Sequence, residues 1–242
     1  MKWVYTSQRK EYANALLDIG QKRTDVVVLD ADLSSSTRTS EFAKKFPERF
    51  FNVGIAEQNL MGTAAGLAVS GKTVFASTFA VFATGRCWDQ IRQSIAYPNS
   101  NVKIVATHAG ITVGGDGASH QALEDIALMR TLPNMYVIVP ADGVEAYKAV
   151  KAVAEHVGPC YVRLGRSDVP MVTTVDSPFE IGKATIIREG SDVSLVSCGQ
   201  MVAVCLDAAE SLQEKGISAE VVNMSTIKPL DAQTLLRSVR KT

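Results

Sequence analysis

The 242-residue sequence has no net charge, no long apolar run and no leader-like amino terminus. Lys and Arg total 25 and so do Asp and Glu, so no overall field favours nucleic acid or an anionic membrane. No run of about 18 or more apolar residues occurs, which predicts no membrane span. The first residues lack the basic segment and apolar stretch of a secretory signal. We therefore predict a cytoplasmic protein without a nucleic-acid or membrane partner.

Cysteine is sparse, and the chain has only Cys87, Cys160, Cys198 and Cys205. None of them forms a CxxC pair or a spacing typical of metal ligands. Three lie in apolar runs, where cysteine behaves as a small core residue. We expect all four to be reduced and structural.

What the sequence does contain is an alternation of short apolar runs with helical patterns, which predicts an α/β fold. The apolar runs cover residues 26–30, 50–53, 73–77, 102–108, 135–141 and 160–165, and the helical patterns cover 8–22, 56–69, 81–96, 123–132 and 144–156. The runs are almost continuously hydrophobic, as in parallel strands that are buried on both faces. We expect a doubly wound parallel sheet.

The alternation of apolar runs and helical patterns is interrupted once. We expect residues 1–166 to form the first domain and residues 167–182, with two prolines and no period, to form a linker. Residues 183–242 then begin a partial second α/β domain, with strands at 192–199 and 219–227 and helices from 201 to 215 and from 231 onward. A unit of about sixty residues rarely has an independent core, so the second domain looks truncated.

The segment NVGIAEQNLMGTAAGLA, residues 52–68, places Glu57 at the start of a helix that continues with small residues. Small residues allow close approach of another backbone or a flat ligand. From this segment alone, Glu57 is better explained as a residue that favours the positive end of the helix dipole. In the next segment, Phe79, Phe82, Trp88 and Ile91 form an aromatic and apolar stripe. Such a stripe is more often core than a surface that binds a ligand.

The third segment, residues 107–125, places His108 directly after a strand and Asp116 and His120 on a glycine-rich loop. The carboxyl edge of an open α/β sheet is where ligands bind, so these side chains suggest a polar ligand site. A metal site is the alternative, but the spacing does not match a zinc motif. Gly115-Asp116-Gly117 resembles a diphosphate-binding GDG signature, yet the next asparagine, Asn134, follows a proline and comes too soon.

Taken together, the three segments resemble the pyrimidine-binding domain of transketolases. The resemblance rests on GIAEQNLMGTAAGLA (residues 54–68), STFAVFATGRCWDQIR (77–92) and THAGITVGGDGASHQALEDIALMRTLPNM (107–135), which occur in the family's order. Residues 183–242 resemble the start of the family's carboxy-terminal domain. One departure is that the stretch after Phe82 is about one residue longer than in some relatives, and Gly85 stands where others have an aromatic residue.

The resemblance implies thiamine diphosphate as cofactor and gives several residues a role. Glu57 would hydrogen-bond the pyrimidine nitrogen N1′ and exchange a proton with the ring. Phe82 would stack on the pyrimidine with Phe79 beside it, Ile55 would support the bent cofactor, and Asp32 would lie near it. For the substrate, His120, as a catalytic residue, and Asp116 would contact the hydroxyls of the donor sugar. The sugar phosphate would bind Arg9, Ser36, His108 and Arg166, since the planar guanidinium matches phosphate oxygens.

The resemblance also implies a partner chain, because no segment here matches the domain that binds the diphosphate and Mg²⁺. We expect a transketolase amino-terminal subunit to supply it, with two copies of this chain in contact within a heterotetramer. The expected activity is ketol transfer between sugar phosphates, as in the pentose phosphate pathway. The alternatives are a 1-deoxyxylulose-5-phosphate synthase-like subunit, a 2-oxo-acid dehydrogenase β-like subunit, or a non-catalytic module on this fold. His108 and His120 together favour ketol transfer.

Overall fold

Seven strands form the central sheet of the computed structural model, which describes residues 2–242. The strand order is β12-β6-β7-β5-β4-β2-β3, and all neighbours are parallel except β6 and β12 (Thr226–Lys228). The parallel strands are β2 (Val26–Asp30), β3 (Phe50–Asn52), β4 (Thr73–Phe79), β5 (Val102–Thr107), β6 (Tyr136–Ile138) and β7 (Cys160–Arg163). Each falls within or overlaps an apolar run of the sequence, which confirms the predicted parallel sheet.

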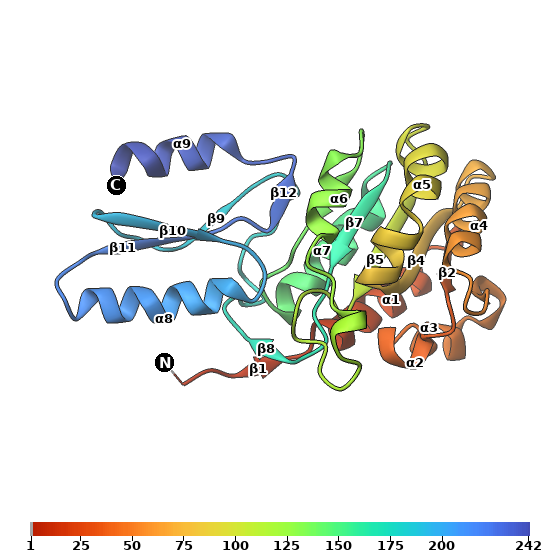
Figure 1. Cartoon of the computed structure of the whole chain (residues 1–242), viewed down its shortest axis with the longest axis horizontal. Helices are drawn as coiled ribbons and strands as arrows, with labels where there is room; N and C mark the ends of the chain where they lie inside the picture. Colours follow the sequence, from red (N-terminus) through yellow and green to blue (C-terminus); the bar gives the residue numbers. More distant parts are fainter. Residues whose placement is uncertain (1) are drawn as a thin grey trace.

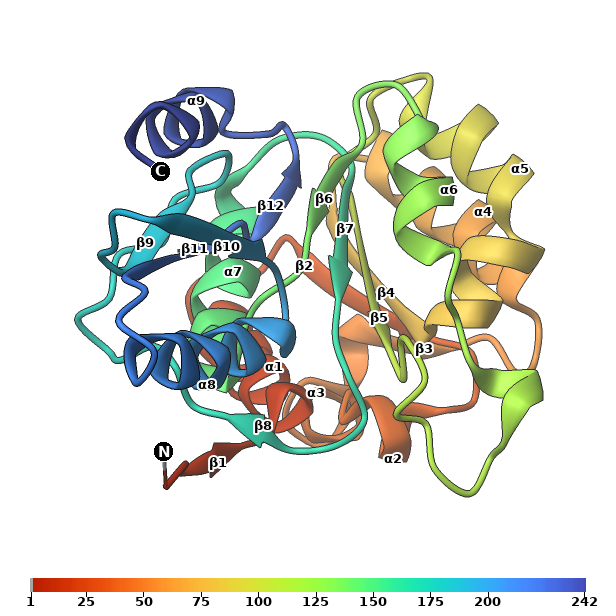
Figure 2. The ribbon, with the colours of Figure 1, turned by 60° about the vertical axis from the view of Figure 1, so that its left-hand side comes forward.

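Helices cover both faces of this sheet (Figures 1 and 2). One layer contains α1 (Gln8–Lys22), α3 (Ser40–Lys45) and α7 (Gly143–Glu155), and the other contains α4 (Glu57–Val69), α5 (Trp88–Gln90) and α6 (Asp125–Thr131). Tyr12, Leu16 and Phe42 fill the core under the first layer, and Leu60 and Met61 lie in the core under the second. The doubly wound α/β fold is therefore confirmed. Helix α7 begins where expected, because Asp142 caps it by accepting a hydrogen bond from the Glu145 amide.

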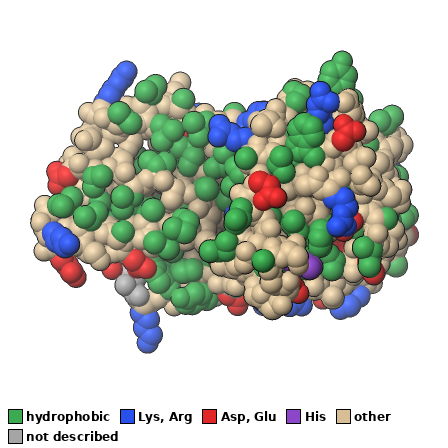
Figure 3. All heavy atoms as spheres, in the orientation of Figure 1, with side chains coloured by type: hydrophobic (Ala, Val, Ile, Leu, Met, Phe, Trp, Pro, Cys, Tyr) green, Lys and Arg blue, Asp and Glu red, His purple; other side chains and the backbone are tan. Residues whose placement is uncertain are grey.

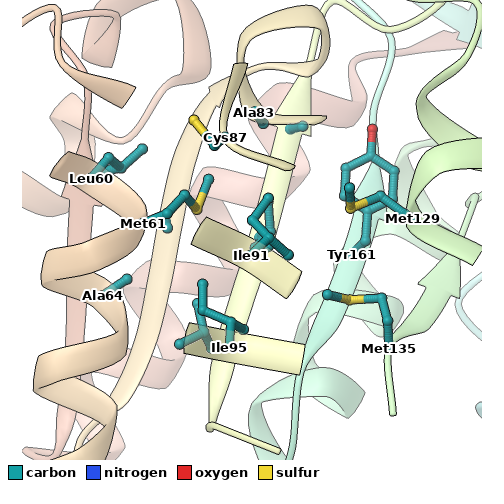
Figure 4. Close-up of a cluster of buried hydrophobic side chains, with 14 of the residues drawn as sticks. Leu60, Met61, Ala64, Ala83, Cys87, Ile91, Ile95, Met129, Met135 and Tyr161 are labelled. Carbon is teal, nitrogen blue, oxygen red and sulfur yellow. The ribbon is translucent and has the colours of Figure 1, made fainter. Parts of the chain in front are cut away.

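The prediction of one regular helix over residues 81–96 is wrong. The segment is π-helical at Phe82–Arg86, turns at Cys87, continues as α5 and is π-helical again at Ile91–Ala96. A π-helical turn contains one more residue per turn than an α-helical one and continues the helix in the same direction. Figure 4 shows Ala83, Cys87 and Ile91 pointing into the core beside α4. Core packing therefore holds one side of a segment whose backbone is irregular.

The carboxy-terminal part contains a three-stranded sheet, β10-β11-β9. Its elements are β9 (Thr185–Arg188), which was not predicted, and β10 (Val193–Ser197), α8 (Met201–Gln213), β11 (Ala219–Asn223) and α9 (Ala232–Lys241). The prediction of a single strand over residues 219–227 is wrong. The chain leaves the small sheet after Asn223, and β12 (Thr226–Lys228) pairs antiparallel with β6 of the central sheet.

The segment expected to be an irregular linker contains a short strand. Strand β8 (Val169–Pro170) pairs antiparallel with β1 (Tyr5–Thr6) near the amino terminus. The carboxylate of Asp142 then accepts hydrogen bonds from the Val172 and Thr173 amides at 2.7 and 2.6 Å. These contacts attach residues 167–182 to the start of α7.

Charged side chains are scattered over the face that Figure 3 shows, whereas apolar side chains gather over its carboxy-terminal part. Exposed apolar residues of that part include Val196, Met201, Val204 and Leu236. All four cysteines are unpaired, as expected. Across residues 2–242, none of the helices combines the length and the apolar character that crossing a bilayer requires.

Candidate active site

The candidate site residues follow the carboxyl ends of neighbouring parallel strands. These ends meet at one edge of the sheet, where open α/β folds bind their ligands. The side chains expected from the sequence come after β2 (Asp32, Ser36), β3 (Ile55, Glu57), β4 (Phe79 at its last position, Phe82), β5 (His108, Asp116, His120) and β7 (Arg166), with Arg9 on the first turn of α1. The topology thus brings residues that lie far apart in the sequence to one edge.

Four aromatic rings from two segments form the centre of the site. The rings of Phe79 and His108 stack with centroids 3.7 Å apart and planes inclined by 19°. Phe82 lies nearly parallel to Phe79 at 6.0 Å. His120 approaches edge-on, 5.3 Å from Phe82 and 6.2 Å from Phe79. The aromatic stripe of the sequence is therefore divided: Phe79 and Phe82 face the histidines, while Ile91 is buried in the core.

His108 is buried and uncharged at neutral pH. The residue is only 2% exposed, and its backbone lies in the left-handed region with φ of 59°. Burial, with Arg9 and Arg166 nearby, lowers the pKa of His108 to about 4. Its Nδ1 forms a 2.9 Å hydrogen bond with the Thr107 hydroxyl, which fixes the ring. A neutral imidazole in this position can accept or donate a hydrogen bond without carrying charge.

The carboxylate of Glu57 is buried at the amino terminus of α4 and is 3% exposed. Its Oε2 accepts a hydrogen bond from Nη1 of Arg86 at 2.7 Å. The guanidinium carbon of Arg86 lies 4.9 Å from the centroid of the Phe82 ring. Arg86 therefore joins the carboxylate to the aromatic cluster. It was not among the residues expected from the sequence, although an arginine four positions after Phe82 in the aromatic segment is a signal that could have found it.

Cationic side chains lie at the other end of the site. Nη1 of Arg9 donates to the backbone carbonyl of Ser36 at 2.8 Å, while its Nε is buried and has no hydrogen-bond partner. Burial, followed by the charges of Arg38 and Arg166, lowers the pKa of Arg9. Three cations in one region favour an anionic ligand. Arg38, in the left-handed region with φ of 71°, was missed by the sequence reasoning.

An open hollow of about 610 Å³ adjoins this cationic region. It is lined mainly by polar and charged side chains from α1, from the segment after β2 and from the segment after β7 (Ser7, Arg9, Lys10, Asn14, Arg38, Glu41 and Asp168 among them). Both signs of charge are present, with Arg9, Arg38 and Lys10 opposed by Glu41 and Asp168.

The glycine-rich loop after β5 packs closely against the side chain of Arg166. Gly114 has φ of 80°, and a side chain there would overlap the guanidinium of Arg166. Gly117 also has a positive φ, of 74°, but the space around it is open. Asp116, exposed on the same loop, is close enough for its charge to act on His108. The loop thus brings an acidic side chain near the histidine and packs against the guanidinium of Arg166.

The turn after β2 is held by a buried carboxylate. Asp30 is fully buried and accepts hydrogen bonds from the Leu33 amide and from the hydroxyls of Thr37 and Thr39, at 2.6, 2.7 and 2.8 Å. Burial raises the pKa of Asp30. These bonds fix the segment that carries Asp32 and Ser36.

Two of the expected residues lie on exposed turns. Asp32 has φ of 63°, and its Oδ1 accepts a hydrogen bond from Nδ2 of Asn52 at 3.1 Å. The side chain of Ile55 is 78% exposed. Among residues 2–242, no group of three or more His, Cys, Asp and Glu side chains could hold a metal ion, so His108, Asp116 and His120 do not form a metal site in this arrangement.

Comparison with known proteins identifies the family. Residues 5–172 match the family model "Transketolase, pyrimidine binding domain", and residues 182–242 match "Transketolase, C-terminal domain". The chain belongs to the transketolase family. It is 54% identical over 237 residues to a putative transketolase C-terminal section of Methanocaldococcus jannaschii, a match that covers 97% of this chain and 75% of that protein.

Other members of the transketolase family support the same assignment. The chain is 42% identical over 234 residues to a 6-deoxy-6-sulfo-D-fructose transketolase subunit of Clostridium, covering 97% of this chain and 73% of the relative. A solved "split gene transketolase, inactive beta4 tetramer" superimposes with a TM-score of 0.91 at 57% identity, covering 98% of this chain and 77% of that one. Transketolase of Campylobacter jejuni, at 24% identity and a TM-score of 0.88, shares the fold over 99% of this chain and 38% of its own length.

Proposed function

We propose that this chain is the pyrimidine-binding subunit of a two-chain transketolase. It would transfer a two-carbon ketol unit from a ketose phosphate to an aldose phosphate with thiamine diphosphate as cofactor. Membership of the transketolase family and the similarity to a split-gene transketolase support this proposal. The diphosphate and its Mg²⁺ would be held by an amino-terminal partner subunit.

The observation that carries the proposal is the position of the Glu57 carboxylate beside the Phe82 ring. A buried carboxylate needs a partner, and here a planar N–H donor, the Arg86 guanidinium, contacts both the carboxylate and the ring. An aminopyrimidine is also flat and would present a ring nitrogen to the carboxyl and a face to the phenyl ring. The residues present therefore fit the pyrimidine end of thiamine.

When bound, the cofactor supplies an electron sink for the carbon that the ketose donates. Glu57 would hold a proton at the ring nitrogen, and burial would exclude water from that hydrogen bond. Phe82 and Phe79 would fix the orientation of the ring. His120, edge-on to both phenyl rings, would contact the donor sugar's hydroxyls together with Asp116.

The opposite end of the site suits a substrate with a terminal anion. Arg9 and Arg166 would bind the anionic group, with the uncharged His108 and the Ser36 segment completing the pocket. The names of two relatives include 6-deoxy-6-sulfo-D-fructose and apulose-4-phosphate. Both sugars end in an acidic group, which supports the assignment of the cationic region to that end of the substrate.

The experiment that tests the proposal replaces Glu57 by Gln in the complex with the partner subunit. An amide of the same shape cannot exchange the proton, so we expect ketol transfer to fall by about 10²–10⁴-fold at saturating cofactor. The matched control is Glu48→Gln, because Glu48 is an exposed carboxylate paired with Arg49. Activity of Glu57→Gln within a few-fold of wild type would contradict the proposal.

A further inference from the structure

Arg86 makes the two contacts that the proposed function assigns to the cofactor's pyrimidine ring. Its Nη1 lies 2.7 Å from Oε2 of Glu57, and its guanidinium lies over the Phe82 ring at 4.9 Å. A guanidinium is planar, donates hydrogen bonds in its plane and stacks on aromatic faces. An aminopyrimidine offers the same combination of a flat face and an in-plane hydrogen bond. One site on the protein therefore has two candidate occupants.

The two occupants compete for the carboxylate, where Arg86 already contacts Oε2. Glu57 is 3% exposed, so few directions of approach to its oxygens remain. Arg86 also holds the carboxylate in a short, charge-assisted hydrogen bond. The proposed catalytic role needs Glu57 to share a proton with a ring nitrogen instead. The ion pair and the cofactor contact are therefore alternative states of the same residue.

We propose that Arg86 occupies the pyrimidine subsite of the cofactor-free chain and is displaced from Glu57 and Phe82 when the ring binds. This inference rests on the proposed function, since it takes Glu57 and Phe82 as the pyrimidine contacts. Arg86 would satisfy the buried carboxylate until the cofactor arrives and would compete with it for the subsite. It acts as an internal competitor that lowers the apparent affinity of the cofactor.

The surroundings of Arg86 allow the displacement. Its side chain is 50% exposed, whereas its partner is almost fully buried, so the guanidinium can move into solvent while the carboxylate stays in place. Arg86 ends the π-helical stretch Phe82–Arg86, and the preceding Gly85 has open space around it. The incoming ring would replace the guanidinium as hydrogen-bond partner of the carboxylate, so the buried charge is not left unpaired when Arg86 moves away.

The test measures cofactor affinity in the complex with the partner subunit, by calorimetry with thiamine diphosphate and Mg²⁺. We expect Arg86→Ala to bind the cofactor more tightly, with Kd lowered about five- to thirtyfold, because no side chain has to leave the subsite. In a Glu57→Gln background the same substitution should change Kd by much less, since the charge that holds Arg86 is gone. Arg92→Ala is the matched control, because Arg92 lies over Trp88 on the same segment at 5.8 Å.

A second measurement needs no substitution. Phenylglyoxal labels exposed guanidinium groups, and peptide mass spectrometry separates Arg86 from Arg92. If the cofactor displaces Arg86 into solvent, its labelling rate relative to Arg92 should rise when thiamine diphosphate is added to the complex. An unchanged or reduced relative rate would overturn the displacement.

The outcomes separate this inference from the proposed function. If the wild-type complex binds the cofactor and Arg86→Ala binds it equally or more weakly, the competitor role is wrong while the transketolase assignment stands. If the wild-type complex binds no thiamine diphosphate, the proposed function fails and the inference fails with it. Tighter binding by Arg86→Ala that persists unchanged with Glu57→Gln would also overturn the role, because the effect would not pass through the carboxylate.

Discussion

The imidazole of His108 lies flat on the phenyl ring of Phe79, with centroids 3.7 Å apart. Phe79 ends the fourth strand and His108 directly follows the fifth, so the contact spans two neighbouring strands at the edge where the site forms. The stack leaves only the edge of the imidazole free for polar contacts. It therefore connects the aromatic half of the site with its cationic half.

This stacked histidine predicts a dependence of stability on pH. The pKa of His108 is about 4 in the folded protein, below its ordinary value of 6.5, so between these values the unfolded chain binds the proton and the folded one does not. Stability should fall as the pH falls through this window, by up to about 1.4 kcal/mol per pH unit from this group. Urea unfolding midpoints of wild type and His108→Gln should therefore converge between pH 7 and pH 4.5. A constant difference across that range would contradict the assignment.

The two ends of the proposed substrate site should respond differently to substitution. Arg166→Ala removes a charge-assisted contact worth about 1.5–3 kcal/mol, so the KM for phosphorylated sugars should rise roughly ten- to hundredfold with kcat little changed. His120→Ala should mainly lower kcat with sugar donors. Steady-state kinetics of the two-chain complex with phosphorylated and unphosphorylated donors would check both. Equal damage by Arg166→Ala to both kinds of donor would remove Arg166 from the anion pocket.

Gly114 offers a test of the same pocket through the backbone. Gly114→Ala would be strained at φ of 80° and would push the Arg166 guanidinium aside. Gly117→Ala is the matched control, because it is strained in the same way but has open space around it. We expect Gly114→Ala alone to raise the KM for phosphorylated donors, while both variants lower the melting temperature by similar amounts. If Gly117→Ala raised the KM equally, loop strain rather than Arg166 would be responsible.

Cofactor binding should depend on the partner chain. The pyrimidine contacts provide one hydrogen bond and stacking, too little to offset the cost of immobilising the ligand, whereas the diphosphate and Mg²⁺ need oxygen ligands that the partner would supply. Calorimetry of this chain alone with thiamine diphosphate and Mg²⁺ should therefore show weak binding or none. Adding the amino-terminal subunit should produce affinity and activity together. Tight binding that depends on Mg²⁺ without any partner would rule out the division between two chains.

Elements with strong local signals were predictable from the sequence. Helix α1 begins and ends at the expected residues, and strand β2 matches its apolar run, because VVVLD has few alternatives to a buried strand. Phe79, Phe82, His108 and His120 were each expected to contribute to one site, because their motifs follow consecutive strands, but the stacking of their rings was not expected. Their proposed chemical roles remain predictions.

The features that escaped prediction depend on tertiary contacts. Arg86 contacts Glu57, which lies 29 positions earlier in the sequence. No local pattern around either residue indicates that they meet. The π-helical turns lie on either side of Cys87 while Ala83, Cys87 and Ile91 are all held in the core, and no local pattern indicates them. In the sequence, the residues of β12 continue the apolar run of β11 almost without a break. Only the pairing of β12 with β6 shows that the run forms two strands in different sheets.

Strand β12 has a consequence for how the chain unfolds. Thr226 and Lys228 lie near the carboxyl terminus in sequence but pair with Ile138 and Val137 at the border of the central sheet. The Nζ of Lys228 also donates a hydrogen bond to the Leu132 carbonyl. This side chain therefore ties the carboxy-terminal segment to the backbone just before β6. The amides of β6 should therefore exchange hydrogen at the rate set by opening of the carboxy-terminal segment. Proteolysis within residues 167–182 would then leave two fragments that remain associated until both melt.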